Sequence, residues 1–237
     1  HAHYATVLRA AAAGGARALG FDVFFDIPRE KWVPDLDRQF AAAFQEVSAS
    51  TPVIMGYDTL QLSAQLPRVY MLASMQGALG FTNLTFDDDG FARRQELQGR
   101  GREATESFAT RLALLYLQAE RAVMDPQRRA LRLGSRTLPL DAEGFLRVHY
   151  WGPAGTFPTI SMADVLAAAQ KQDAAQLERW FRGKTVLIGT LDPTDRQPTP
   201  FYSAGGSQGQ MMPGVEIHAN VLATILEQRF LREVSPA

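Results

Sequence analysis

In the first quarter of the chain, hydrophobic residues at helical spacing alternate with short continuous hydrophobic runs. Residues 4–13 are rich in alanine and stop at a glycine pair, which predicts a helix and its end. The next run, residues 19–25, is mostly apolar and predicts a buried strand. Residues 35–47 place apolar side chains on one helical face, and residues 51–57 predict another strand. Helices that alternate with short apolar strands are typical of parallel βαβ units, so we expect an α/β fold.

The middle of the chain carries turn signals between shorter runs. Residues 80–94 predict two strands joined by an Asp-Gly turn, and residues 130–140 predict a hairpin with a Gly-Ser turn. A helix is expected over residues 103–122, and a further strand over residues 145–151. We therefore expect one α/β domain whose mostly parallel or mixed sheet is flanked by helices and extended by β-hairpins.

The last third combines a short strand, a long loop and a helix. Residues 186–188 are apolar and end at Gly189, which predicts a strand buried on both faces. Residues 192–212 form a connection longer than compact domains usually contain. From Pro213 onward, apolar residues recur at three- and four-residue spacings, which predicts a helix over residues 215–231.

Composition narrows the class of protein and of partner. The chain of 237 residues is 46% apolar and 21% charged, as in an ordinary soluble domain. Its net charge of -1 provides no basic surface, so we expect no nucleic-acid partner. The absence of cysteine excludes disulfides and thiolate metal sites. No apolar stretch reaches the roughly 20 residues that a membrane-spanning helix needs.

Carboxylates follow three of the predicted strands. In open α/β sheets, ligands bind beyond the carboxyl ends of the strands. The candidate ligand-binding residues are therefore Asp26, Asp58, Asp192 and Asp195. The loop of residues 192–212 can cover that edge. Aspartate at these positions also caps helices and turns, so a purely structural role stays open.

The sequence lacks the common patterns of catalytic and metal sites. It has no His-Glu-X-X-His, no Gly-X-Ser-X-Gly and no phosphate-binding glycine loop. His149 lies in a predicted strand and His218 on the inner side of a predicted helix, where a histidine is more often a core residue than a ligand. The run Asp87-Asp88-Asp89-Gly90 offers oxygen ligands for calcium, but it lacks the EF-hand spacing and suits a charged turn. We expect no catalytic residue, no metal and no cofactor.

Several separated motifs resemble a known family in their order along the chain. They are YWGPAGTFPT at 150–159, FRGKTVLIGT at 181–190, PGVEIHANVL at 213–222, and the shorter ARALGFD at 16–22. These motifs, with the segment at 80–94, resemble the type-2 CHASE domain, a sensory module outside the membrane in bacterial receptors. The resemblance implies that residues 1–237 are a sensor domain. Family members place one further strand before the first helix, so we expect that strand and the flanking membrane segments to lie outside the 237 residues.

The resemblance implies a function in signal transduction. It implies the periplasmic part of an inner-membrane receptor, with flanking transmembrane helices and a cytoplasmic output domain. That output is an adenylate or guanylate cyclase, a histidine kinase of a two-component system, a serine/threonine kinase or a cyclic-di-nucleotide enzyme. The sensor itself is then no enzyme, its ligand is a small molecule or a protein, and a homodimer is the expected assembly. Leu222 and Leu226, on the predicted last helix, are the candidate residues that transmit the signal.

Two other functions stay open from the residues alone. A small α/β enzyme would use strand-end carboxylates such as Asp22, Asp192 and Asp195, although no nucleophile–base pair accompanies them. A dimerisation or protein-docking module would use the glycine-rich segment 205–209 as a loop that becomes ordered on a partner.

Overall fold

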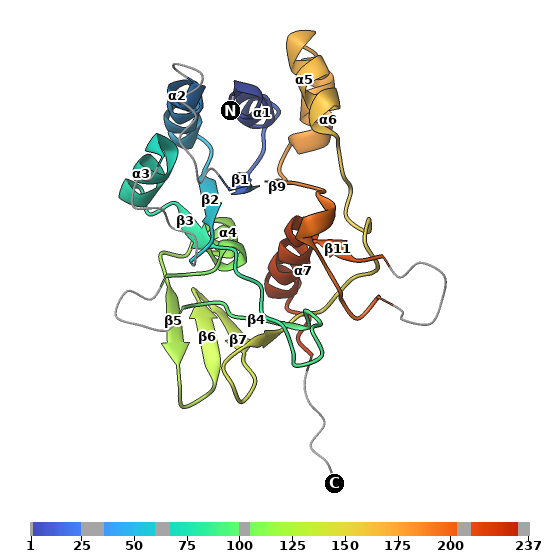
Figure 1. Cartoon of the computed structure of the whole chain (residues 1–237). Coiled ribbons are helices and arrows are strands. Elements are labelled where there is room, and N and C mark those ends of the chain that lie inside the picture. The colour runs from blue at the N-terminus through green and yellow to red at the C-terminus, as the bar shows by residue number, and fades with distance from the viewer. Residues whose placement is uncertain (1, 25–35, 60–66, 100–104, 203–209, 232–237) are drawn as a thin grey trace. The chain divides into compact units, whose positions relative to one another are not determined.

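The computed structural model describes residues 2–24, 36–59, 67–99, 105–202 and 210–231 (Figure 1). The chain divides into two compact units. Unit 1 comprises residues 1–81 and 159–188, and unit 2 comprises residues 82–158 and 189–237.

A four-stranded sheet lies at the centre of unit 1. Its strands, in spatial order, are β3 (Leu79–Phe81), β2 (Val53–Tyr57), β1 (Ala18–Asp22) and β9 (Thr185–Gly189). β1 is parallel to β2, with Leu19 opposite Val53, and β2 is parallel to β3. Every residue of β1 and β2 is buried. This burial explains their uninterrupted apolar runs, because a strand covered on both faces has no polar side to present.

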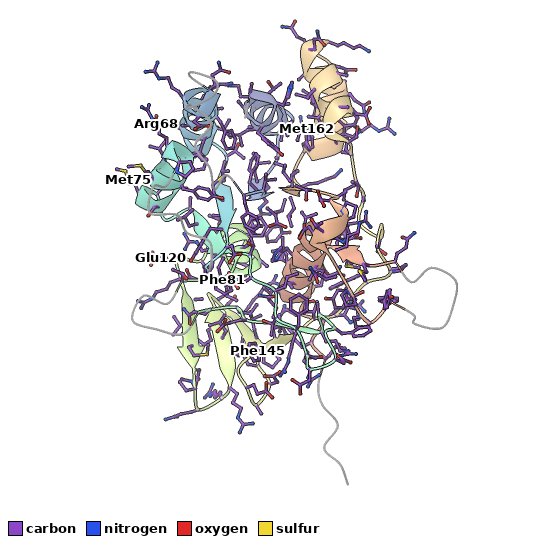
Figure 2. All side chains as sticks on the ribbon, in the orientation of Figure 1. Arg68, Met75, Phe81, Glu120, Phe145 and Met162 are labelled. Carbon is purple, nitrogen blue, oxygen red and sulfur yellow. The ribbon has the colours of Figure 1, made fainter. Side chains whose placement is uncertain are left out.

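Helices flank this sheet in unit 1. They are α1 (Ala2–Ala13), α2 (Leu36–Ser48), α3 (Arg68–Met75), α5 (Met162–Gln170) and α6 (Ala174–Phe181). Figure 2 labels Arg68 and Met75 at the two ends of α3, Phe81 at the end of β3 and Met162 at the start of α5. α1 packs against α2, α5 and α6. A Cβ added to Gly14 would lie 2.6 Å from the carbonyl oxygen of Leu177, so the end of α1 approaches α6 too closely for any side chain there.

Unit 2 combines antiparallel strands with two packed helices. The strands β5 (Ala122–Asp125), β6 (Ala130–Leu133) and β7 (Arg136–Pro139) form one antiparallel sheet. Two further antiparallel pairs join β4 (Arg94–Gln95) to β8 (Leu146–Arg147), and β10 (Arg196–Gln197) to β11 (Met212–Pro213). The helices α4 (Phe108–Leu117) and α7 (Gly214–Glu227) pack against each other (Figure 1).

The predicted fold class is confirmed: a parallel sheet flanked by helices carries additional antiparallel hairpins. The hairpin predicted at 130–140 is present as β6 and β7. The predicted pairing within residues 80–94 is largely wrong. Its Asp-Gly turn forms, since the Gly90 N–H donates to the Asp87 carbonyl, but β3 joins the parallel sheet and β4 pairs with β8. An isolated bridge from Thr85 to Arg94 and a hydrogen bond from the Asp87 N–H to the Phe91 carbonyl remain of that predicted hairpin.

Two predicted helices are shorter in the structure. α4 begins at Phe108 because the Ser107 hydroxyl accepts the Thr110 N–H, and it ends where Gln118 adopts a left-handed conformation. α7 ends at Glu227, before the predicted limit of residue 231, with Gln228 in the same left-handed conformation. Residue 25 of the predicted first strand and residues 103–104 of the predicted helix lie outside the described residues.

Candidate functional site

A polar stripe runs along α7, which is otherwise largely apolar. Glu216, Asn220 and Thr224 are four residues apart, so they lie on one face of the helix. Asn220 and Thr224 are completely buried, and Glu216 is half-buried. Buried polar side chains are costly unless they have hydrogen-bond partners. Each residue of this stripe has hydrogen-bond partners in the segment of residues 149–157.

Glu216 is bound by three consecutive backbone N–H groups. The Gly155 N–H lies 2.9 Å from both carboxylate oxygens, and the N–H groups of Thr156 and Phe157 lie 3.0 and 3.4 Å from Oε1. Gly155 has a φ of 88°, in the left-handed region that favours glycine. Consecutive N–H groups that converge in this way form a concave anion-binding site. We call residues 153–157 the anion loop.

Asn220 and Thr224 continue the same attachment along the helix. Asn220 Oδ1 accepts the Trp151 N–H at 3.0 Å, and Thr224 Oγ1 accepts the His149 N–H at 3.0 Å. Both side chains also donate to carbonyls inside α7, at 2.9 and 2.8 Å. The backbone N–H groups of His149, Trp151 and residues 155–157 are therefore satisfied by helix side chains rather than by another strand. Any shift of α7 along this segment must break these bonds.

A guanidinium group binds the last turn of α7. Arg136, on β7, donates from Nη1 to the carbonyls of Ile225, at 3.1 Å, and Leu226. The last carbonyls of a helix have no partner within the helix, and a positive charge there also suits the helix dipole. Side chains therefore hold α7 at its first turn, along its length and at its end.

Asp195 and His218 lie beside the start of α7. The Asp195 carboxylate fills the space next to Gly214, because a Cβ added there would be 2.8 Å from Oδ1. His218 is 2% exposed, its ring lies 5.4 Å from that of Phe108, and its Nδ1 has no hydrogen-bond partner among the described residues. Burial lowers the pKa of His218 to about 4, while the Asp195 charge and a hydrogen bond with the Thr82 backbone act in the opposite direction. His218 is therefore neutral at neutral pH.

Unit 1 places two carboxyl groups at the carboxyl ends of adjacent parallel strands. Asp22 is the last residue of β1, and Asp58 follows β2 directly and is half-buried. Burial raises the pKa of Asp22 to about 7. A carboxyl group that titrates near neutral pH is a candidate functional group, although structural sites also contain such groups.

Two of the other predicted ligand-binding residues are found in a different unit from Asp58, which belongs to unit 1. Asp192 and Asp195 belong to unit 2, in a short 3-10 turn (Pro193–Asp195) and its cap. Asp192 is exposed and accepts the N–H and the hydroxyl of Thr194 at 2.8 and 2.6 Å, bonds that lower its pKa. Asp26 lies outside the described residues. Ligand binding by these four carboxylates stays a prediction.

The acidic run at Asp87 is organised by two arginines. Arg93 lies 2.9 Å from Asp87 and 2.8 Å from Asp89, and Arg94 lies 2.7 Å from Asp87 and also contacts Glu143. This network pairs Asp87 and Asp89 of the turn with arginines. Within the described ranges, no group of three or more acidic or histidine side chains is arranged to hold a metal ion.

Sequence reasoning missed the three residues of the polar stripe. Glu216, Asn220 and Thr224 interrupt an apolar helix at a regular four-residue spacing, and that spacing is the signal that identifies them. The predicted transmitting residues, in contrast, lie on the helix as expected: Leu222 is buried and Leu226 is half-buried on α7.

Comparison with known proteins gives one family and no individual relative. The CHASE2 domain family matches residues 1–237, the whole chain. No curated protein and no solved structure matches it. Among the helices of the described segments, none has the length and apolar character required to cross a membrane.

Proposed function

The chain belongs to the CHASE2 domain family of extracytoplasmic sensory domains, and from this membership we propose that it is the input domain of a bacterial transmembrane receptor. A domain of this family senses and does not itself catalyse a reaction. In the receptor it lies on the periplasmic side of the inner membrane. It regulates a cytoplasmic adenylate or guanylate cyclase, a histidine kinase or a serine/threonine kinase.

The attachment of α7 is the observation that supports this proposal best. Glu216, Asn220 and Thr224 bind the backbone of residues 149–157, so α7 has one preferred position along that segment. Hydrogen bonds are directional, so a shift of the helix breaks this set of hydrogen bonds and either forms a different set or forms none. A helix with discrete positions is suited to transmit a signal, provided that the ligand binds the two arrangements with different affinity.

The test uses the receptor that contains this domain. Leu222→Met and Leu226→Met conserve side-chain volume, so they repack α7 while the fold is kept. We expect either substitution to change cyclase or kinase output, in its basal level or in its response to periplasmic extracts. Leu191→Met is the matched control, because Leu191 is an exposed leucine outside α7. Unchanged regulation in both folded α7 variants would reject α7 as the transmitting helix.

The ligand and the assembly are part of the same proposal. The ligand is a small molecule or a protein, with Asp26, Asp58, Asp192 and Asp195 as candidate contacts, and the receptor acts as a homodimer. Light scattering of the purified domain at two concentrations measures the assembly directly.

A further inference from the structure

We propose that the anion loop is a binding site for the carboxylate or phosphate group of a small molecule, and that Glu216 occupies it as a displaceable internal ligand. This inference goes beyond the proposed function, because it assigns a site and a class of ligand. Its effect on signalling rests on the proposed function, but anion binding does not.

The contacts of Glu216 are those of a bound anion. The three N–H groups of residues 155–157 reach both carboxylate oxygens, and Gly155 alone donates to each of them at 2.9 Å. A free carboxylate group presents the same pair of oxygens at the same spacing, and a phosphate group presents a similar pair at a slightly wider spacing. Backbone N–H groups recognise the charge and the oxygen geometry, not the rest of the molecule.

The loop keeps its shape by contacts that do not involve Glu216. The Thr156 hydroxyl donates to the Pro153 carbonyl at 2.6 Å, and the Thr156 N–H is shared between that carbonyl, at 3.2 Å, and Glu216. A Cβ added to Gly152 would lie 2.4 Å from Thr156 Oγ1, so the loop closes tightly on the residue that precedes it. We therefore expect the three N–H groups to stay convergent when the Glu216 side chain rotates away.

The site is accessible to a ligand from solvent. The bonds from Gly155 and Thr156 to Glu216 are solvent-exposed, and a Cβ added to Gly155 would meet no atom within 4 Å. Glu216 competes as an intramolecular group, at an effective concentration of about millimolar. A simple anion therefore binds the wild type weakly, whereas a ligand with a second contact can displace Glu216. Displacement releases the first turn of α7, while Asn220 and Thr224 keep the rest of the helix attached.

The experiment removes the internal ligand and offers external ones. The amide NMR signals of Gly155, Thr156 and Phe157 are followed in Glu216→Ala during titration with sodium acetate and with inorganic phosphate. Sodium chloride at matched ionic strength is the salt control. We expect saturable shifts of these three signals at millimolar acetate or phosphate in the variant, and at least tenfold weaker binding in the wild type. Glu227→Ala removes the same charge from an exposed position of α7 and is expected to behave as the wild type does.

Two results overturn the proposal. One is a folded Glu216→Ala domain whose three signals do not saturate with either anion. The other is a response of the Glu216→Ala signals to sodium chloride that equals their response to acetate or phosphate. An equal response of Glu227→Ala to acetate or phosphate would have the same meaning. If Glu216→Ala does not fold, Glu216→Gln replaces it, because the amide keeps the side chain but lacks its charge. Binding to Glu216→Gln no tighter than to the wild type then overturns the proposal. Anion binding without any change of receptor output in Glu216→Ala would contradict the proposed role of α7 and leave the site intact.

Discussion

Replacing Asp22 with asparagine changes how stability depends on pH. Asp22 is 8% exposed at the end of β1, and burial raises the pKa of its carboxyl from 3.8 to about 7. Between these values the folded protein keeps a proton that the unfolded chain has lost. The free energy of unfolding therefore falls as pH rises through this window, and above it the fold contains a buried carboxylate. Since one pKa unit corresponds to about 1.4 kcal/mol, the full loss is on the order of 4 kcal/mol.

Asparagine has nearly the shape of aspartic acid and stays neutral at every pH. We expect Asp22→Asn and the wild type to unfold with similar free energies near pH 4, where both side chains are neutral in the folded protein. Near pH 8 the variant is expected to be more stable by up to about 4 kcal/mol. The gain is smaller if water reaches the carboxylate of the wild type and solvates its charge. Urea unfolding at pH steps from 4 to 8 measures the difference, since the titration of all other groups is common to both proteins.

Asp192→Asn is the control with the opposite sign. The hydrogen bonds from Thr194 lower the pKa of Asp192, so its stabilising contribution is present above 3.8 and is lost as pH falls through the lowered value. The difference in the free energy of unfolding between Asp192→Asn and the wild type should therefore stay constant between pH 5 and 8. If the difference for Asp22→Asn is equally constant over that range, Asp22 does not titrate there and the reasoning is wrong.

Two further substitutions test the surroundings of α7. Burial lowers the pKa of His218 from 6.5 to about 4. The free energy of unfolding of the wild type therefore falls by about 3 kcal/mol as pH falls through that window. In urea unfolding, the free energy of unfolding of His218→Gln should fall clearly less between pH 7 and 4 than that of the wild type. An equal fall in both proteins would contradict this account. Arg136→Ala leaves the carbonyls of Ile225 and Leu226 without their donor, so we expect a loss of about 1–3 kcal/mol and faster amide exchange in the last turn of α7. Arg128→Ala, at a side chain that is 82% exposed, should stay within about 0.5 kcal/mol of the wild type, and equal stability of the two arginine variants would exclude the capping role.

The sequence predicts elements well where local pattern and burial agree. β1 and β2 are fully buried, so their apolar runs are visible without any knowledge of the partner strand. Residues 80–94 show the limit of this reasoning. The Asp87 turn is a local property and forms as predicted, but the strand before it pairs with β2 and the strand after it with β8. Which strand pairs with which depends on contacts distant in sequence, and local spacing does not contain them.

The candidate site was harder to predict because half of it is backbone. A glutamate in the first turn of a helix is expected simply to complement the helix dipole, so Glu216 gives no signal of its own. Its partners are N–H groups about sixty residues away in the chain, and of these only Gly155 has a distinctive residue type. Asp22 illustrates a second limit. Its place at the end of a strand is visible from the sequence, but the burial that moves its pKa is a property of the packed unit.

The motifs that identify the family form two attachments, one in each unit. In unit 1 the Gly183 N–H donates to the Gly15 carbonyl and the Arg17 N–H to the Lys184 carbonyl, which joins the start of β9 to the start of β1. In unit 2 the polar stripe of α7 joins residues 213–222 to residues 150–159. The second attachment both stabilises α7 and, in our proposal, sets its signalling position. Receptor output alone therefore does not separate a folding defect in α7 from a signalling change, so anion binding and unfolding must be measured on the isolated domain first.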